Sequence, residues 1–158
     1  MDKQKIEFIE FMIECGALEF GDFVTKSGRE SPYFINSGRF NTGPRVNRLG
    51  VFYARQVEQH FHDGYDCLYG PAYKGIPLVV TTSAALSSLY QRETPFFFNR
   101  KEVKDHGERG ALIGYHPHLG DRVLILEDVI TAGTSVRETK LLFQTLEGIS
   151  IEGLKEQY

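Results

Sequence analysis

The chain has 158 residues, a length typical of one compact domain, and its hydrophobic fraction of 41% and charged fraction of 25% are ordinary for a globular protein. The net charge of −3 leaves no overall basic field, so we expect no nucleic-acid or membrane partner, and an anionic ligand would need a local basic site. No apolar run reaches the ~18 residues that a membrane helix needs, and the charged start MDKQKIEFIEF lacks a signal-peptide core, so we expect a cytoplasmic protein.

The first part of the chain predicts two helices separated by strands. Isoleucines recur at helical spacing in residues 6–13, and Gly16 stands where a C-cap glycine is common. Residues 17–38 alternate short apolar runs with Gly and Ser, which indicates strands and turns. A second amphipathic helix is predicted to begin at Pro44 and to end near Gly64.

The remainder alternates strands with helices. The predicted elements are strand 65–70, a largely buried helix 76–90, strands 95–99 and 122–127, helix 134–147, and the start of a further strand at 149–154. This order predicts a single α/β domain, residues 1–158, with a mainly parallel central sheet flanked by helices.

Three unusual segments each follow a predicted strand. They are GPAYKG at 70–75, FNRKEVKDHGERG at 98–110 and EDVITAGTS at 127–135. Ligands of such sheets bind beyond the carboxyl ends of the strands. We therefore expect the three segments to share one site.

The segment EDVITAGTS combines two carboxylates with a loop that suits an anion. Backbone N–H groups and hydroxyls of residues 131–135 can converge on a phosphate at the start of the next helix. Glu127 and Asp128 would repel that phosphate, so they should face the hydroxyls of a sugar. A ribose 5-phosphate that bridges the two surfaces satisfies both. The alternative is an acidic turn capped by a Thr or Ser without a ligand.

The charged segment FNRKEVKDHGERG is long for a loop inside a compact domain, and such loops are often lids. Movable cations suit a diphosphate leaving group, whose charge grows as its bond breaks. Lys74, between the two glycines of GPAYKG, could meet the same diphosphate. The alternatives are a solvated charged loop and a plain strand-to-helix turn.

The segment KSGRESPYFINSG, residues 26–38, offers a cation and an aromatic ring. Lys26 and Phe34 together would suit a flat, negatively charged heterocycle. Solvation of Lys26 and burial of Phe34 are the alternatives.

Four stretches together resemble the type I phosphoribosyltransferases, and within them the orotate phosphoribosyltransferases. They are KSGRESPYFINSG, YGPAYKGIPL, FNRKEVKDHGERG and LILEDVITAGTSVRE. The acidic pair followed by TAGTS indicates the broad family, whereas KSGRESPYF with FNRKEVKDHGERG indicates the orotate branch. The resemblance extends from about Ile6 to Gly153. It implies a small N-terminal hood beside the sheet, and the reaction of orotate with phosphoribosyl diphosphate (PRPP) to give orotidine 5′-monophosphate and diphosphate, in UMP biosynthesis.

The resemblance also implies roles for individual residues. The implied PRPP-binding residues are Tyr73, Lys74, Arg100, Lys101, Lys104, His106, Glu127, Asp128, Val129, Ile130, Thr131, Ala132, Gly133, Thr134 and Ser135. The implied orotate-binding residues are Lys26, Phe34, Ile35 and Thr131. Lys104, His106 and Asp128 are the implied catalytic residues. Family likeness further implies Mg²⁺ held mainly by PRPP oxygens and water, without a protein metal ligand, and a homodimer whose lid is shared across subunits.

Three features depart from the family's usual pattern. Glu127 stands where Asp is usual, and Ile35 replaces a second aromatic after Phe34. The chain ends with GISIEGLKEQY, whereas relatives continue with an arginine that helps to bind orotate, so we expect a domain that lacks this C-terminal part. Two other functions are alternatives: a phosphoribosyltransferase for another base, which KSGRESPYF opposes, and a non-catalytic PRPP-binding regulatory protein, which the lid residues oppose.

Overall fold

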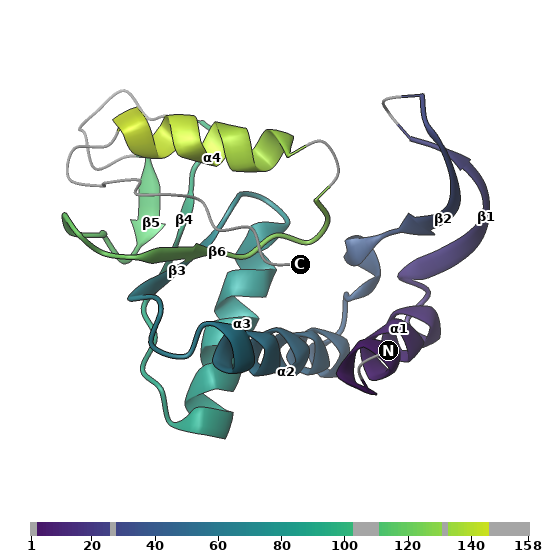
Figure 1. Cartoon of the computed structure of the whole chain (residues 1–158), viewed down its shortest axis with the longest axis horizontal. Helices are drawn as coiled ribbons and strands as arrows, with labels where there is room; N and C mark the ends of the chain where they lie inside the picture. The colour runs from purple at the N-terminus through teal and green to yellow at the C-terminus, as the bar shows by residue number, and fades with distance from the viewer. Residues whose placement is uncertain (1–2, 26–27, 103–110, 131–132, 146–158) are drawn as a thin grey trace.

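The structure is a computed structural model, and it describes residues 3–25, 28–102, 111–130 and 133–145 (Figure 1). The helices are α1 (Lys3–Glu14), α2 (Gly43–His60), α3 (Gly75–Tyr90) and α4 (Thr134–Thr145), with a 3₁₀ turn η1 at Ser37–Arg39. The strands are β1 (Leu18–Val24), β2 (Glu30–Ile35), β3 (Cys67–Gly70), β4 (Phe96–Asn99), β5 (Leu112–Gly114) and β6 (Val123–Ile125). Within the described ranges, no helix is both long and apolar enough to span a membrane.

The central sheet has the strand order β5-β4-β3-β6. Strand β3 pairs in parallel with both β4 and β6, and β5 adds to the far edge in antiparallel orientation. The prediction of a mainly parallel sheet is therefore confirmed. The antiparallel β5 was not predicted, and β6 is shorter than the predicted strand 122–127, so the acidic pair lies in the loop beyond its end.

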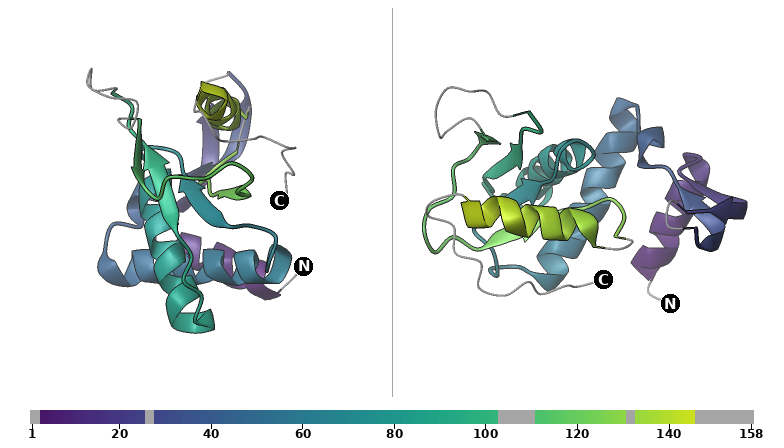
Figure 2. Two further views of the ribbon diagram at one scale, coloured as in Figure 1. Left: turned by 90° about the vertical axis from the view of Figure 1, so that its left-hand side faces the viewer. Right: turned by 90° about the horizontal axis from the view of Figure 1, so that it is seen from above.

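Alternation along β3 separates two cores, one on each face of the sheet. Leu68 packs with Val79 of α3 and Val57 of α2, whereas Tyr69 points to the opposite face and packs with Phe143 of α4. Figures 1 and 2 accordingly show α4 on one side of the sheet, with α2 and α3 on the other. This arrangement confirms the predicted flanking helices. Because β3, β4 and β6 run parallel, their carboxyl ends lie at one edge of the sheet.

The hood consists of α1 and the antiparallel hairpin β1–β2, which lie beside the sheet (Figure 1). A third core joins α1 to α2, since the Phe11 and Phe52 rings stack with centroids 5.4 Å apart. Gly16 ends the first helical segment with a φ of 68°, in the left-handed region that glycine adopts without strain. The chain then leaves β2 through η1 and passes directly to the edge of the sheet that carries the acidic pair.

Candidate active site at the carboxyl edge of the sheet

A pocket of about 430 Å³ opens at the carboxyl edge of the sheet. It is lined from the β3–α3 turn, the end of β4, the loop after β6 and one face of α4. The lining residues are Tyr69, Pro71, Ala72, Tyr73, Lys74, Asn99, Lys101, Glu127, Glu138, Thr139 and Leu142. Residues from each of the three segments that the sequence singled out therefore line one pocket.

The β3–α3 turn is tight because its two glycines approach each other. A Cβ atom on Gly75 would lie 2.7 Å from the carbonyl carbon of Gly70, so neither position leaves room for a side chain. The peptide bond between Ala72 and Tyr73 is cis. This turn leaves Tyr73 and Lys74 exposed, with 64% of Tyr73 accessible to solvent.

The end of β4 contacts that turn. The side-chain oxygen of Asn99 accepts hydrogen bonds from the Tyr69 hydroxyl at 2.9 Å and from the Ala72 N–H at 2.8 Å. Two residues further on, the Lys101 ammonium lies 5.3 Å from the centroid of the Tyr73 ring, within cation–π range. Lys74 and Lys101 thus supply positive charge on one side of the pocket.

The acidic turn supplies the opposite charge. Oδ2 of Asp128 accepts a 2.6 Å hydrogen bond from the Ser37 hydroxyl and lies 3.4 Å from the Lys74 ammonium. Burial alone would raise the pKa of Asp128, but the Ser37 hydrogen bond and the Lys74 charge, with help from the Val129 N–H, outweigh it and lower the pKa. Asp128 is therefore an anion at neutral pH, although only 11% of its side chain is exposed.

Tyr53 of α2 also contacts the acidic turn. Its hydroxyl donates a 2.9 Å hydrogen bond to the backbone carbonyl of Glu127. Burial, followed by the charges of Asp128 and Glu127, raises the pKa of Tyr53 far above its ordinary value. The hydroxyl therefore keeps its proton and remains a donor at neutral pH.

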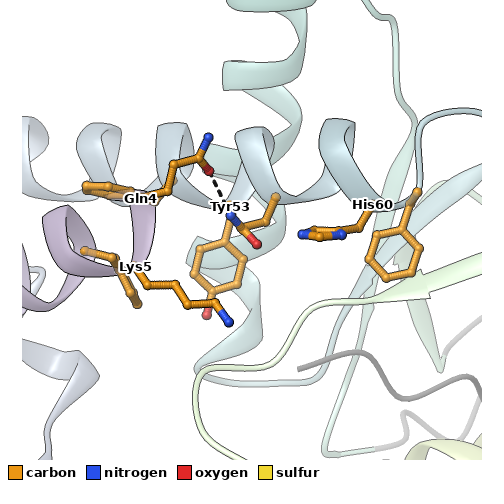
Figure 3. Close-up of a pocket in the computed structure, with 8 residues that line it drawn as sticks. Gln4, Lys5, Tyr53 and His60 are labelled. Atoms are coloured by element: carbon orange, nitrogen blue, oxygen red, sulfur yellow. Dashed lines mark hydrogen bonds between the residues drawn. The ribbon is translucent and has the colours of Figure 1, made fainter. Parts of the chain in front are cut away.

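The other side of Tyr53 borders a second hollow, of about 290 Å³, between α1 and α2 (Figure 3). Its walls are mostly aromatic, and a 2.9 Å hydrogen bond from the Gln56 amide to the Gln4 side-chain oxygen crosses its rim. Lys5 and His60 also line it. It contains none of the residues that the sequence predicted for the site.

Comparison with known proteins agrees with this geometry. An orotate phosphoribosyltransferase of Clostridium beijerinckii is 55% identical over 154 residues, which cover 98% of this chain and 69% of that protein. One of Clostridium botulinum is 51% identical with the same coverage. The chain belongs to the orotate phosphoribosyltransferase family.

Solved structures support the same assignment. The crystal structure of the orotate phosphoribosyltransferase of Francisella tularensis superposes with a TM-score of 0.78 at 38% identity, covering 94% of this chain and 67% of that one. No family model matches the chain. The predicted family is therefore confirmed by relatives that extend beyond the length of this chain.

Several residues expected from the orotate phosphoribosyltransferase pattern lie outside the described residues, and the structure does not test them. They are Lys26, Lys104, His106, Thr131 and Ala132. Among the described ones, Arg100 is exposed at the end of β4, and Ile130 is 46% exposed beyond the acidic turn. Gly133 has a φ of 67° and directly precedes α4, which begins with Thr134 and Ser135. Its carbonyl accepts a 3.1 Å hydrogen bond from the Arg137 N–H in the first turn of that helix.

The hood residues expected to bind orotate lie on β2. Phe34 is 48% exposed, and its ring packs 5.6 Å from that of Phe23 across the hairpin. Ile35 is half-buried and pairs with Leu18. Two residues further along the chain, Ser37 joins the end of the hood to the acidic turn through its hydrogen bond to Asp128.

Sequence reasoning missed Ser37, Tyr53 and Asn99. On sequence alone, Tyr53 falls within the second predicted helix and Ser37 within the region of strands and turns, with no sign of a role at the site. Asn99 was included in the charged segment without a role. The signal that could have found Asn99 is its position as the last residue of a buried parallel strand, since such residues face the ligand edge of the sheet.

Proposed function

We propose that the chain transfers the phosphoribosyl group of PRPP to orotate, giving orotidine 5′-monophosphate and diphosphate in UMP biosynthesis. The observation that carries this proposal is the 3.4 Å approach of Lys74, which lines the pocket, to Asp128 of the acidic turn. A sugar that bears a diphosphate needs a carboxylate for its hydroxyls and a cation for its leaving group, next to each other. The likeness to orotate phosphoribosyltransferases over nearly the whole chain supports the choice of substrate.

Asp128 and Glu127 are suited to bind the ribose. Asp128 is ionised, and its oxygens are already oriented by Ser37 and by the Val129 N–H at 2.9 Å. A carboxylate fixed in this way accepts hydrogen bonds from sugar hydroxyls with little further loss of side-chain freedom. We expect Lys74 to move from Asp128 to the diphosphate when PRPP binds, because a diphosphate carries more negative charge than one carboxylate.

The same cations promote the reaction. The bond between C1′ and the diphosphate oxygen breaks with its electron pair leaving on diphosphate. A ring N–H of orotate loses its proton, which the released diphosphate can take up, and the nitrogen forms the new bond to C1′ with the electron pair left behind. Negative charge builds on the leaving group while positive charge builds on the sugar. Lys74 and Lys101 stabilise the first, and the carboxylates of the acidic turn stabilise the second. Lys104 and His106 would add to the leaving-group side.

Mg²⁺ is the proposed cofactor. Family likeness implies an ion held mainly by PRPP oxygens and water, as is common for Mg²⁺. The hard oxygen ligands at the site are the carboxylates of Glu127 and Asp128, and these would contact the ion or its waters. When bound, the ion would supply neutralisation of the diphosphate charge.

Three further parts of the proposal rest on family likeness. Lys26, Phe34, Ile35 and Thr131 would contact orotate. The chain would act as a homodimer in which segment 98–110 reaches the neighbouring subunit's site. The location would be the cytoplasm. Sedimentation velocity tests the dimer directly, because a monomer at micromolar concentration would contradict it.

The proposed function is tested by following orotate consumption spectrophotometrically with PRPP and Mg²⁺. We expect turnover of orotate and none of hypoxanthine, adenine or uracil; consumption of another base instead would reject orotate as the substrate.

Lys104→Ala should abolish most turnover without changing the unfolding temperature, whereas Lys140→Ala, at an exposed lysine of α4, should leave turnover intact. Asp128→Asn should impair use of PRPP, and unchanged PRPP kinetics would refute the role of the acidic turn.

A further inference from the structure

Asn99 occupies the point where β4 meets the turn that carries Tyr73 and Lys74. Two donors converge on its side-chain oxygen, the Tyr69 hydroxyl at 2.9 Å and the Ala72 N–H at 2.8 Å. Tyr69 is only 1% exposed, and burial raises the pKa of its hydroxyl to about 12, so that partner is rigid and remains a donor. Because both partners donate, the oxygen and not the nitrogen of the amide must face them.

The Ala72 bond fixes the part of the turn that matters for an anion. Ala72 directly precedes the two exposed residues that reach into the pocket, Tyr73 and Lys74. The turn is also held by the close approach of Gly70 and Gly75 at its two ends, and by backbone hydrogen bonds from the Gly75 N–H to the Pro71 carbonyl at 2.8 Å and from the Ile76 N–H to the Tyr73 carbonyl at 3.2 Å. Asn99 is therefore the described side chain that restrains the middle of the turn through a backbone hydrogen bond.

The chemical type of the side chain is also informative. An aspartate at position 99 would offer the same two donors an equally placed oxygen. It would also add a negative charge to a pocket wall whose cations are Lys74 and Lys101. A neutral amide restrains the turn without repelling a diphosphate.

We propose that Asn99 is a positioning residue for the diphosphate-binding turn, a neutral acceptor that holds Ala72 in place so that Lys74 is presented to the anion. This inference rests on the proposed function for the identity of the anion. Asn99 would thus contribute to diphosphate binding through the turn, without needing to contact the ligand itself.

The test is calorimetric binding of inorganic diphosphate with Mg²⁺ to the full chain, which does not depend on orotate turnover. Asn99→Ala should weaken binding about ten-fold, the effect of losing a well-placed hydrogen bond. Ser83→Ala is the matched control, because it removes another half-buried side-chain hydrogen bond, 2.7 Å long, between α3 and the residue Thr94 that precedes β4. It should lower the unfolding temperature by a similar amount and leave diphosphate binding within about two-fold.

A second variant separates restraint from charge. Asn99→Asp keeps an acceptor oxygen for both donors, so it should unfold near the wild-type temperature. It should still bind diphosphate more weakly, with a deficit that shrinks as salt screens the repulsion. The inference is overturned if Asn99→Ala binds as wild type, if Ser83→Ala loses as much affinity, if Asn99→Asp binds as wild type, or if the wild-type chain does not bind diphosphate. A wild-type chain that binds diphosphate but leaves orotate unchanged would reject the proposed function alone.

Discussion

The Ser37 hydroxyl donates a 2.6 Å hydrogen bond to Oδ2 of Asp128, joining the end of the hood to the acidic turn beyond β6. The two residues are distant in the chain, since Ser37 lies in η1 after the two-stranded sheet and Asp128 lies in the loop after β6 of the four-stranded sheet. A charge-assisted bond of this length is short and strong. It makes the position of the hood and the ionisation of the acidic turn depend on each other.

Ser37→Ala should therefore raise the pKa of Asp128, because one of the interactions that lowers it is removed. A higher pKa means that Asp128 becomes protonated at a higher pH, so the acid limb of the pH–activity profile should move to higher pH. The KM for PRPP should rise about three- to ten-fold, the usual effect of losing one such bond. Ser31→Ala, which removes a hydroxyl from β2 that bonds the Tyr33 carbonyl, is the control and should leave the profile unchanged.

Tyr53→Phe tests the support beneath Glu127. The variant keeps the ring that lines the hollow of Figure 3 and loses only the bond to the Glu127 carbonyl. We expect the free energy of unfolding in urea to fall by about 1 kcal/mol, since a half-buried carbonyl loses its donor. The KM for PRPP should rise as well. Tyr90→Phe, at the exposed end of α3, should change neither quantity, and an equal loss in both variants would contradict a specific role for Tyr53.

The main architecture followed from the sequence because apolar periodicity reports burial directly. CLYG, the sequence of β3, is buried throughout, and its neighbours pair in parallel as the order of strands and helices predicted. Strand β5 was missed because LIG is too short to show alternation and lies next to a polar loop. Its pairing with β4 depends on a backbone ladder and not on a side-chain pattern.

The site was predictable in part. Segments with unusual chemistry after strands predicted that Lys74 and Asp128 lie close together, since the carboxyl ends of parallel strands converge. The residues that orient them were not predictable, because Ser37, Tyr53 and Asn99 act through single hydrogen bonds to distant partners. Such contacts depend on how separate elements pack, and they leave no periodic pattern in the local sequence.

Gly70→Ala should show how closely β3 and α3 approach at the edge of the pocket. A Cβ at this position would overlap the backbone carbonyl of Gly75 and contact Val79, so the turn or the helix must shift. Overpacking against backbone costs about 1–3 kcal/mol. We expect a loss of this size in chemical denaturation, together with weaker PRPP binding. Gly43→Ala at the start of α2, where an added Cβ meets nothing within 4 Å, should be close to neutral.

The ion pair between Asp66 and Arg122 predicts a stability effect confined to acid pH. The guanidinium donates to both carboxylate oxygens, at 2.9 and 3.0 Å, and the Arg122 N–H donates at 2.8 Å. These bonds lower the pKa of Asp66 from 3.8 to about 2. Between these two pH values the unfolded chain binds more protons at this site than the folded chain. The pair's contribution is therefore complete above about pH 4 and is lost as the pH falls towards about 2.

The contribution should be modest, because 40% of the Asp66 side chain is exposed and solvent screens the pair. We expect Asp66→Asn to lose at most about 1 kcal/mol at pH 6. Thermal unfolding of wild type and variant at pH 6 and pH 3 measures the difference, which should shrink at the lower pH. Glu10→Gln, at an exposed carboxylate of α1, should show no comparable change. A gap between wild type and Asp66→Asn that is the same at both pH values would show that the loss comes from packing and not from the charge of Asp66.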